Sequence, residues 1–199
     1  MSRTLVLASQ SPARLATLRA AGIEPVVIVS GVDEDQLAGL APAQLALELA
    51  KLKAGAVAPQ APAGTLVLGC DSVLDLDGEA LGKPGTAEEA IRRWKQMRGR
   101  TGTLVTGHAL VDTASRETVS ATGSTVVHFA DVSDAEIAAY VGTGEPLNVA
   151  GAFTVDGLGG AFVRGIEGDH HNVVGLSLPL LRELCARLGH AYTDLWTSR

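Results

Sequence analysis

The sequence predicts an α/β fold, with a mixed β-sheet and flanking helices. Apolar runs typical of buried strands alternate along the chain with segments that carry helix caps and a helical spacing of apolar residues. Two long runs, 104–112 and 118–129, are joined by a short turn and are typical of an antiparallel hairpin. Because strand–helix alternation favours parallel neighbours and a hairpin adds an antiparallel pair, the sheet should be mixed.

The chain opens with a predicted strand, a helix and a second strand. Residues 4–8 form a short apolar run of the kind that a buried strand shows. Ser11 is a favourable N-cap, Pro12 is a favourable first helical residue, and Gly22 should end this helix. The apolar run 26–29 predicts the second strand.

A longer helix, predicted over 42–58, should direct one lysine inward. Its apolar stripe consists of Leu45, Leu49, Leu52 and Ala56. At about 100° per residue, Lys53 lies along the edge of that stripe and should point toward the body of the protein. Lys51 points away from the stripe and should be solvated.

The middle of the chain predicts a buried strand, a turn and a helix. Residues 65–74 are nearly all apolar apart from a glycine and the pair Asp71-Ser72. The Asp-Gly dipeptide at 77–78 predicts a hairpin-like turn. Thr86 and Glu89 have the spacing of a capping box at the start of the helix that follows.

The last third of the chain contains two predicted helices around a glycine-rich segment. Ser133 and Glu136 have the spacing of a second capping box. Residues 144–168 are rich in glycine and should be largely irregular, with a short strand at 161–164. An apolar helix is predicted over 177–188.

Charge excludes one class of partner. The chain has 199 residues, a formal net charge of −6 and a pI near 5.3, and it contains no run of Lys or Arg. A nucleic-acid polymer bound through its backbone needs a basic face, so this class is excluded. A small phosphorylated ligand stays open, because it needs only a few cations and N–H groups gathered in one cleft.

Length and the distribution of apolar residues predict the organisation and location of the chain. Its size suits a single domain over residues 1–199, with two lobes around a central cleft. The N-terminal apolar run is too short for a secretory signal and no stretch reaches the length of a membrane span, so we expect a cytoplasmic protein without a membrane partner. Cys70 and Cys185 lie in apolar surroundings and are interpreted as buried thiols.

Asp71 is the leading candidate for chemistry. It lies inside an otherwise apolar strand, where burying a charged residue is costly. A carboxylate there needs a cation, a metal ion or a set of hydrogen-bond donors, and such residues commonly bind a metal or act as a general base. The alternative is an aspartate that is only paired in a salt bridge or lies at a strand end.

Two other segments could add to an anion site. The turn with Ser9, Ser11 and Arg14 leads from a strand into a capped helix, whose N-terminus favours negative charge. Most capped helices bind no ligand, so an ordinary cap is the alternative. Lys83, between a glycine and a proline, is a further candidate cation, although the pattern alone favours an isolated surface lysine.

Metal ligands are harder to find. Within the acidic cluster 33–35, Glu34 could supply a carboxylate to a divalent ion, or the cluster could simply be a solvated loop. Adjacent side chains in a loop rarely converge on one ion, so Asp169-His170-His171 is not expected to be a metal site. The isolated histidines His108, His128 and His190 are interpreted as structural. Walker A, nucleophile-elbow and Cys–His patterns are absent from the sequence, which leaves a metal-assisted water attack as the hydrolytic route.

Six of these segments, in this order, resemble the Maf family of nucleoside triphosphate pyrophosphatases over essentially the whole chain. They are Leu7–Arg14, Asp33-Glu34, Lys53-Ala54, Gly69–Val73, Gly82-Lys83-Pro84 and Asn172–Leu178. The resemblance implies an inosine-triphosphatase-like fold and hydrolysis of nucleoside triphosphates, modified or non-standard ones included, to the monophosphate and pyrophosphate.

The same resemblance implies a role for each candidate residue. Asp71 would accept the proton of the attacking water and, with Glu34, would hold a divalent cation, Mg²⁺ or Mn²⁺. The triphosphate would be bound by a group of cationic and hydroxyl side chains, namely Ser9, Ser11, Arg14, Lys53 and Lys83. A homodimer is also implied.

Departures from the family pattern concern the base that is recognised. Ala13 replaces the first arginine of the family turn, Asn148-Val149 replaces an Asp-Lys pair, and Asp156 replaces a glutamine. Together with Ser72, Ala13 and Asp156 are the predicted specificity positions. Two other functions stay open from sequence: a nucleotide-binding regulator of cell division with little catalytic activity, and a phosphatase that removes single phosphates.

Overall fold

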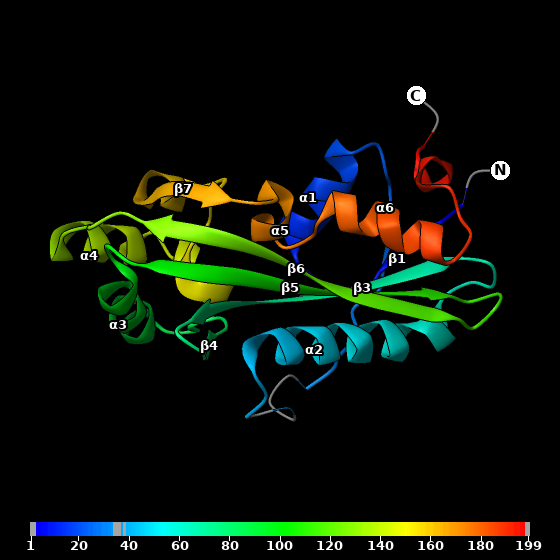
Figure 1. Cartoon of the computed structure of the whole chain (residues 1–199), viewed down its shortest axis with the longest axis horizontal. Helices are drawn as coiled ribbons and strands as arrows, with labels where there is room; N and C mark the ends of the chain where they lie inside the picture. Colours follow the sequence, from blue (N-terminus) through cyan, green and yellow to red (C-terminus); the bar gives the residue numbers. More distant parts are fainter. Residues whose placement is uncertain (1–2, 34–36, 38, 198–199) are drawn as a thin grey trace.

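The computed structural model describes residues 3–33, 37 and 39–197. Over these residues it shows a seven-stranded mixed sheet with flanking helices (Figure 1), so the predicted α/β class is confirmed. The strands are β1 (Leu5–Leu7), β2 (Val26–Val27), β3 (Leu66–Leu76), β4 (Glu79–Leu81), β5 (Thr101–Asp112), β6 (Thr118–Phe129) and β7 (Val163–Glu167). The α-helices are α1 (Pro12–Ala20), α2 (Pro42–Val57), α3 (Ala87–Met97), α4 (Asp134–Gly142), α5 (His170–Val174) and α6 (Leu178–Arg187).

The sheet combines a parallel half with an antiparallel half. Its strand order is β2-β1-β3-β5-β6-β7, and β4 pairs with β3 outside this path. The neighbours β2, β1 and β3 are parallel, whereas β5, β6 and β7 are added in antiparallel pairs. The predicted long hairpin is therefore confirmed as β5 and β6.

Helix α2 covers one face of the sheet, and α1, α5 and α6 cover the other (Figure 1). The α2 side packs through small residues, because a Cβ on Gly107 of β5 would lie 2.1 Å from the carbonyl oxygen of Ala46. The predicted leucine stripe of α2 is consequently wrong at Leu52, which is 41% exposed. The prediction for Lys53 is confirmed, since it is only 6% exposed.

Aromatic residues fill the lobe at the other end of the sheet, where α3, α4 and β7 lie (Figure 1). The Trp94 ring makes edge-to-face contacts with Phe129, Tyr140 and Phe162 at centroid distances of 5.6 to 5.8 Å. Separate apolar clusters lie between the sheet and the helices at the α2 end. Two lobes thus share one continuous sheet, as the sequence predicts.

Helix caps largely follow the prediction. The Ser11 side chain caps α1, and Ser133 with Glu136 forms a complete capping box on α4. At α3, Thr86 accepts from the Glu89 N–H, but Glu89 itself turns to two arginines of its own helix instead of closing the box. Hydrogen bonds from these arginines lower the pKa of Glu89 to about 2.

The glycine-rich segment is more regular than predicted. It contains the 3₁₀ turns η3 (Glu145–Asn148), η4 (Ala150–Ala152) and η5 (Leu158–Phe162), and the predicted strand at 161–164 is found further on as β7. The predicted second strand is also shorter than expected, since β2 spans two residues. Of the helices in the described part of the chain, none is both long and apolar enough to cross a bilayer.

Candidate active site at a break in the sheet

The candidate site lies where one edge of β3 changes partner. Strand β1 pairs with residues 66–68 of β3, and β4 pairs with residues 74–76 along the same edge. Residues 69–73 lie between these two paired stretches. Their other edge is paired with β5, and on the edge shared by β1 and β4 they are flanked, within the described residues, only by the ends of those two strands. Asp71 and Ser72 are in the centre of this break, and the loops that follow β1 and β4 run toward it from opposite directions.

Asp71 faces α2. Because side chains alternate along a strand, it shares this face with Gly69, whose absent Cβ would meet the α2 backbone. The Lys53 Nζ atom donates to Asp71 Oδ1 over 2.5 Å, and each residue is 6% exposed. The predicted carboxylate is therefore buried next to a cation, and little water reaches it.

Ser72 faces the opposite side of the sheet, where it meets Arg14 from α1. The Arg14 guanidinium donates to Ser72 Oγ over 3.2 Å, to Ser9 Oγ over 3.2 Å and to the Gly175 carbonyl oxygen over 2.8 Å. All three acceptors are neutral, although Arg14 is only 9% exposed. Within the described residues no carboxylate pairs with this buried cation, so its charge is left for a bound anion to neutralise.

The turn before α1 offers fewer N–H groups than the sequence suggests. Ser9 Oγ accepts from the Ser11 N–H over 3.1 Å, and Ser11 Oγ caps the Arg14 N–H over 3.4 Å. Pro12 has no N–H to offer. Two N–H groups of this turn are thus bonded within it, and the Arg14 side chain adds buried donors beside it. A guanidinium has five N–H groups, and the described residues accept from three of them, which leaves two for a ligand.

Lys83 and Glu34 are the two remaining residues of the predicted site. Lys83 is exposed in the loop after β4, the loop that approaches the break from the far side. The preceding residue is fixed, since the Gly82 carbonyl oxygen accepts from the Gly151 N–H and from Arg93. Glu34 lies outside the described residues.

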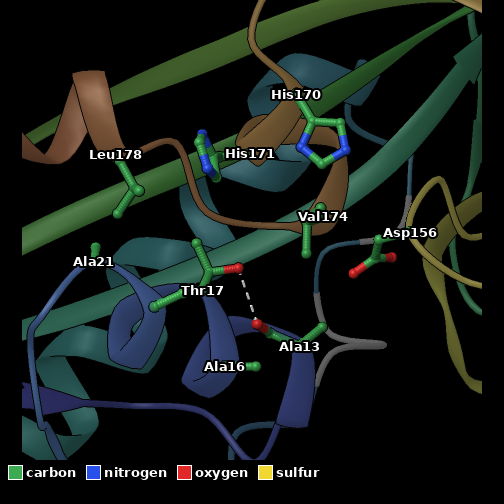
Figure 2. A pocket seen from close by; sticks show the side chains of 10 residues that line it. Ala13, Ala16, Thr17, Ala21, Asp156, His170, His171, Val174 and Leu178 are labelled. Carbon is green, nitrogen blue, oxygen red and sulfur yellow. Dashed lines mark hydrogen bonds between the residues drawn. The ribbon is translucent and has the colours of Figure 1, made fainter.

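A pocket of about 310 Å³ opens beside α1, on the Arg14 side of the sheet (Figure 2). Two of the predicted specificity positions, Ala13 and Asp156, line it from elements far apart in sequence. Figure 2 shows His170 and His171 of α5 on its upper rim. Ser72, the third specificity position, instead contacts Arg14. The three predicted specificity positions therefore lie in two places, two of them in the pocket and one at the break in the sheet.

The loop that carries Asp156 is held by a residue that the sequence did not indicate. Glu145 accepts hydrogen bonds from the Tyr140 and Thr154 hydroxyls at 2.9 and 2.5 Å and from the N–H groups of Leu158 and Gly159, both at 3.0 Å. Burial by itself would raise the pKa of Glu145, but these donors outweigh it and the pKa is lowered. Asp156 is thus presented on a rigid loop.

The isolated histidines make structural contacts, as predicted. His108 Nδ1 bonds the Thr106 carbonyl oxygen and Nε2 accepts from the Ser177 N–H, while His128 and His190 pair with Glu167 and Asp112. Burial lowers the pKa of His108 to about 4. Cys70 and Cys185 are buried free thiols, and burial raises the pKa of Cys70 to about 12.

This α/β protein thus has, at one break in its sheet, a buried carboxylate–lysine pair and a buried arginine that no described carboxylate pairs with, an arrangement that suits an anionic ligand. The chain belongs to the Maf family, because the model of the Maf-like proteins matches residues 4–188.

Relatives match over nearly the full length. A protein of Streptomyces avermitilis is 63% identical over 99% of this chain and 96% of its own length, and one of Streptomyces coelicolor is 64% identical over 98% and 95%. Both are named nucleoside triphosphate pyrophosphatase. Among solved structures, the Ham1 protein of Staphylococcus aureus is similar over 65% of this chain and 73% of its own, at 18% identity and a TM-score of 0.45.

Proposed function

We propose that the protein hydrolyses nucleoside triphosphates, ribo- or deoxyribo-, to the monophosphate and pyrophosphate. One observation carries the proposal: the break at residues 69–73 brings together a buried carboxylate with its lysine and a buried arginine that no carboxylate of the described residues pairs with. The names of the relatives that match over nearly the whole chain support the same activity.

The triphosphate is held mainly by Arg14 in this proposal. A triphosphate carries about four negative charges, and fixed cations and N–H donors stabilise the charge that develops during phosphoryl transfer. The two uncommitted guanidinium N–H groups of Arg14, the hydroxyls of Ser9 and Ser11 and the ammonium of Lys83 supply such donors from the two loops that flank the break.

Asp71 acts as the general base. Its carboxylate accepts a proton from a water molecule, whose oxygen forms a bond to the α-phosphorus while the bond from that phosphorus to the bridging oxygen breaks, so that pyrophosphate leaves. Lys53 keeps the carboxylate oriented through the 2.5 Å hydrogen bond.

A divalent cation, Mg²⁺ or Mn²⁺, belongs to the proposal. In the described part of the chain, no three His, Cys, Asp or Glu side chains gather into a metal-binding group. Mg²⁺ usually takes one or two protein carboxylates and completes its shell with water and substrate phosphates, so Asp71 and Glu34 suffice as proposed ligands. Such an ion would neutralise charge on the phosphate oxygens.

The nucleobase is proposed to occupy the pocket of Figure 2, beside Arg14 along α1. A pocket of about 310 Å³ is at the small end of ligand sites and suits one base. Asp156 offers only acceptors when ionised, so it favours a base edge that presents N–H donors. Modified and non-standard bases are included among the proposed substrates.

Product analysis tests the proposal. Native protein, Asp71→Asn and the control Asp75→Asn, which changes a turn residue of the same strand, are incubated with a panel of nucleotides and Mg²⁺. We expect monophosphate and pyrophosphate from the native and control proteins and at least about 100-fold less from Asp71→Asn. Diphosphate with inorganic phosphate would identify a phosphatase, and nucleotide binding without turnover in all three proteins would favour the regulator.

A further inference from the structure

Arg14 is connected to strand β5 and helix α5, on its own side of the sheet, by a chain of hydrogen bonds. Its guanidinium donates to Ser72 Oγ, which lies 2.9 Å from Thr106 Oγ1 on the neighbouring strand β5. Thr106 Oγ1 in turn donates to the Asn172 carbonyl oxygen of α5 over 3.0 Å. Thr106 is 0% and Asn172 1% exposed, so the last bond of the chain is shielded from water, whereas Ser72 is half-buried.

The hydroxyl groups in this chain point one way. A threonine has a single hydroxyl proton, and Thr106 gives it to Asn172. Ser72 must therefore donate to Thr106, which leaves the lone pairs of Ser72 Oγ directed at Arg14. The aligned hydroxyl dipoles turn their negative ends toward the guanidinium, and each bond strengthens the next.

Helix α5 is fixed by the side chain of Asn172. This amide donates to the Leu104 carbonyl oxygen and to Thr125 Oγ1, both over 3.1 Å, and so bonds α5 to β5 and β6. A Cβ on Gly123 would lie 2.4 Å from Asn172 Oδ1, so the amide needs a glycine opposite it. A five-residue helix has little stability of its own, and these contacts determine where it lies.

The position of α5 determines the surroundings of Arg14. The residue after the helix, Gly175, accepts the 2.8 Å bond from Arg14 Nε through its carbonyl oxygen. The outer side of the same helix contributes His170, His171 and Val174 to the pocket in Figure 2. One short element therefore supports both the arginine and a wall of the pocket.

We propose that Thr106 and Asn172 are positioning residues, which aim the Arg14 guanidinium at the phosphates through Ser72 and through Gly175. Neither residue touches the substrate. The inference rests on the proposed function, because it assigns these two residues to the phosphate-binding half of that site.

Thr106 offers a matched pair of variants. Thr106→Val removes the hydroxyl and keeps the shape, whereas Thr106→Ser keeps the hydroxyl. Thr65→Val is the control, since it deletes another buried hydroxyl whose bond, to the Pro62 carbonyl oxygen, is remote from Arg14. Calorimetry with inorganic tripolyphosphate should show a Kd about tenfold weaker for Thr106→Val, with Thr106→Ser and Thr65→Val within about twofold of native.

A double-mutant cycle separates positioning from general destabilisation. Thr106→Val should change KM and kcat in the same proportion as Arg14→Lys. In an Arg14→Gln background, adding Thr106→Val should lower kcat/KM by less than about twofold. The proposal would be overturned if Thr65→Val lowered kcat/KM as much as Thr106→Val does, or if the effects of Thr106→Val and Arg14→Gln on kcat/KM were fully additive. Gly123→Ala, which displaces Asn172 from another direction, should reproduce the kinetics of Thr106→Val.

A readout independent of activity distinguishes this inference from the proposed function. The buried Arg14 Nε–H, bonded to Gly175, should give a slowly exchanging signal in nuclear magnetic resonance spectra of native protein. That signal should exchange faster in Thr106→Val and stay slow in Thr65→Val. If native protein neither cleaves nucleotides nor binds tripolyphosphate, the proposed function fails, whereas unchanged exchange in Thr106→Val refutes the positioning role alone.

Discussion

Replacing Lys53 with methionine tests whether the Lys53–Asp71 pair is as buried as the geometry indicates. Both residues are 6% exposed and their charged atoms are 2.5 Å apart. Removing one partner of such a pair leaves an uncompensated charge and costs about 3–5 kcal/mol. Whole domains are stable by roughly 5–15 kcal/mol, so Lys53→Met should be marginally folded. Urea unfolding at pH 7 with linear extrapolation measures the loss.

The same helix supplies the control. Lys51 pairs with Glu48 at 2.8 Å, but its side chain is 39% exposed, so Lys51→Met should cost less than about 1 kcal/mol. In the double variant Lys53→Met/Asp71→Asn neither position of the pair carries a charge, and stability should recover in large part. The reasoning is refuted if Lys53→Met costs no more than Lys51→Met, or if the double variant is as unstable as the sum of its parts.

Three further predictions concern the supports of the site. His108 has a pKa of about 4 in the folded state, below its usual 6.5. Its contribution to the free energy of unfolding, roughly 3 kcal/mol, is therefore complete above pH 6.5 and is lost as pH falls toward 4. Urea unfolding of native protein and His108→Gln at pH 4.5 and 7.5 should show this loss of stability only in the native chain. Gly69→Ala, whose Cβ would lie 2.3 Å from the Ala50 carbonyl oxygen, should lower stability by at least about 1–3 kcal/mol and displace α2, as thermal unfolding and activity measure. Glu145→Gln should lower stability by about 2 kcal/mol and speed proteolysis within 154–159, because an amide cannot accept all four hydrogen bonds.

Each of the three has a contradicting outcome. Equal pH slopes for native protein and His108→Gln would show that another group titrates. Native stability in Gly69→Ala would mean that α2 is not in close contact with β3. An unchanged cleavage rate in Glu145→Gln would mean that the loop carrying Asp156 is ordered by other contacts.

Local signals in the sequence predicted much of the fold. The Ser11 cap, the Ser133 capping box and the β5–β6 hairpin follow from patterns within a few residues, and the structure has all three. The inward direction of Lys53 followed from helical periodicity alone. Helix α2 shows the limit of such reasoning: hydrophobicity indicated its leucines, but close approach to glycines in the sheet buries three of its alanines together with Leu49 and leaves Leu52 exposed.

The candidate site was predicted as a list of residues, and its geometry was not. Strand alternation in fact implies that Asp71 and Ser72 point to opposite faces, but the break in the sheet beside them follows only from the pairing of β1 and β4. Thr106, Glu145 and the side chain of Asn172 act through partners 5 to 68 residues away in sequence, and no local pattern marks Thr106 or Glu145. A polar side chain within the apolar run after His171 was the signal for Asn172.

Hydrolysis in ¹⁸O-labelled water tests the central claim most directly. A nucleoside triphosphate that the native protein cleaves is incubated in this solvent, and the products are separated and weighed by mass spectrometry. Attack of water on the α-phosphorus, with Asp71 as base, predicts one ¹⁸O atom in the monophosphate, unlabelled pyrophosphate and no product with Asp71→Asn. Label in the pyrophosphate or in inorganic phosphate, or full turnover by Asp71→Asn, would contradict the account.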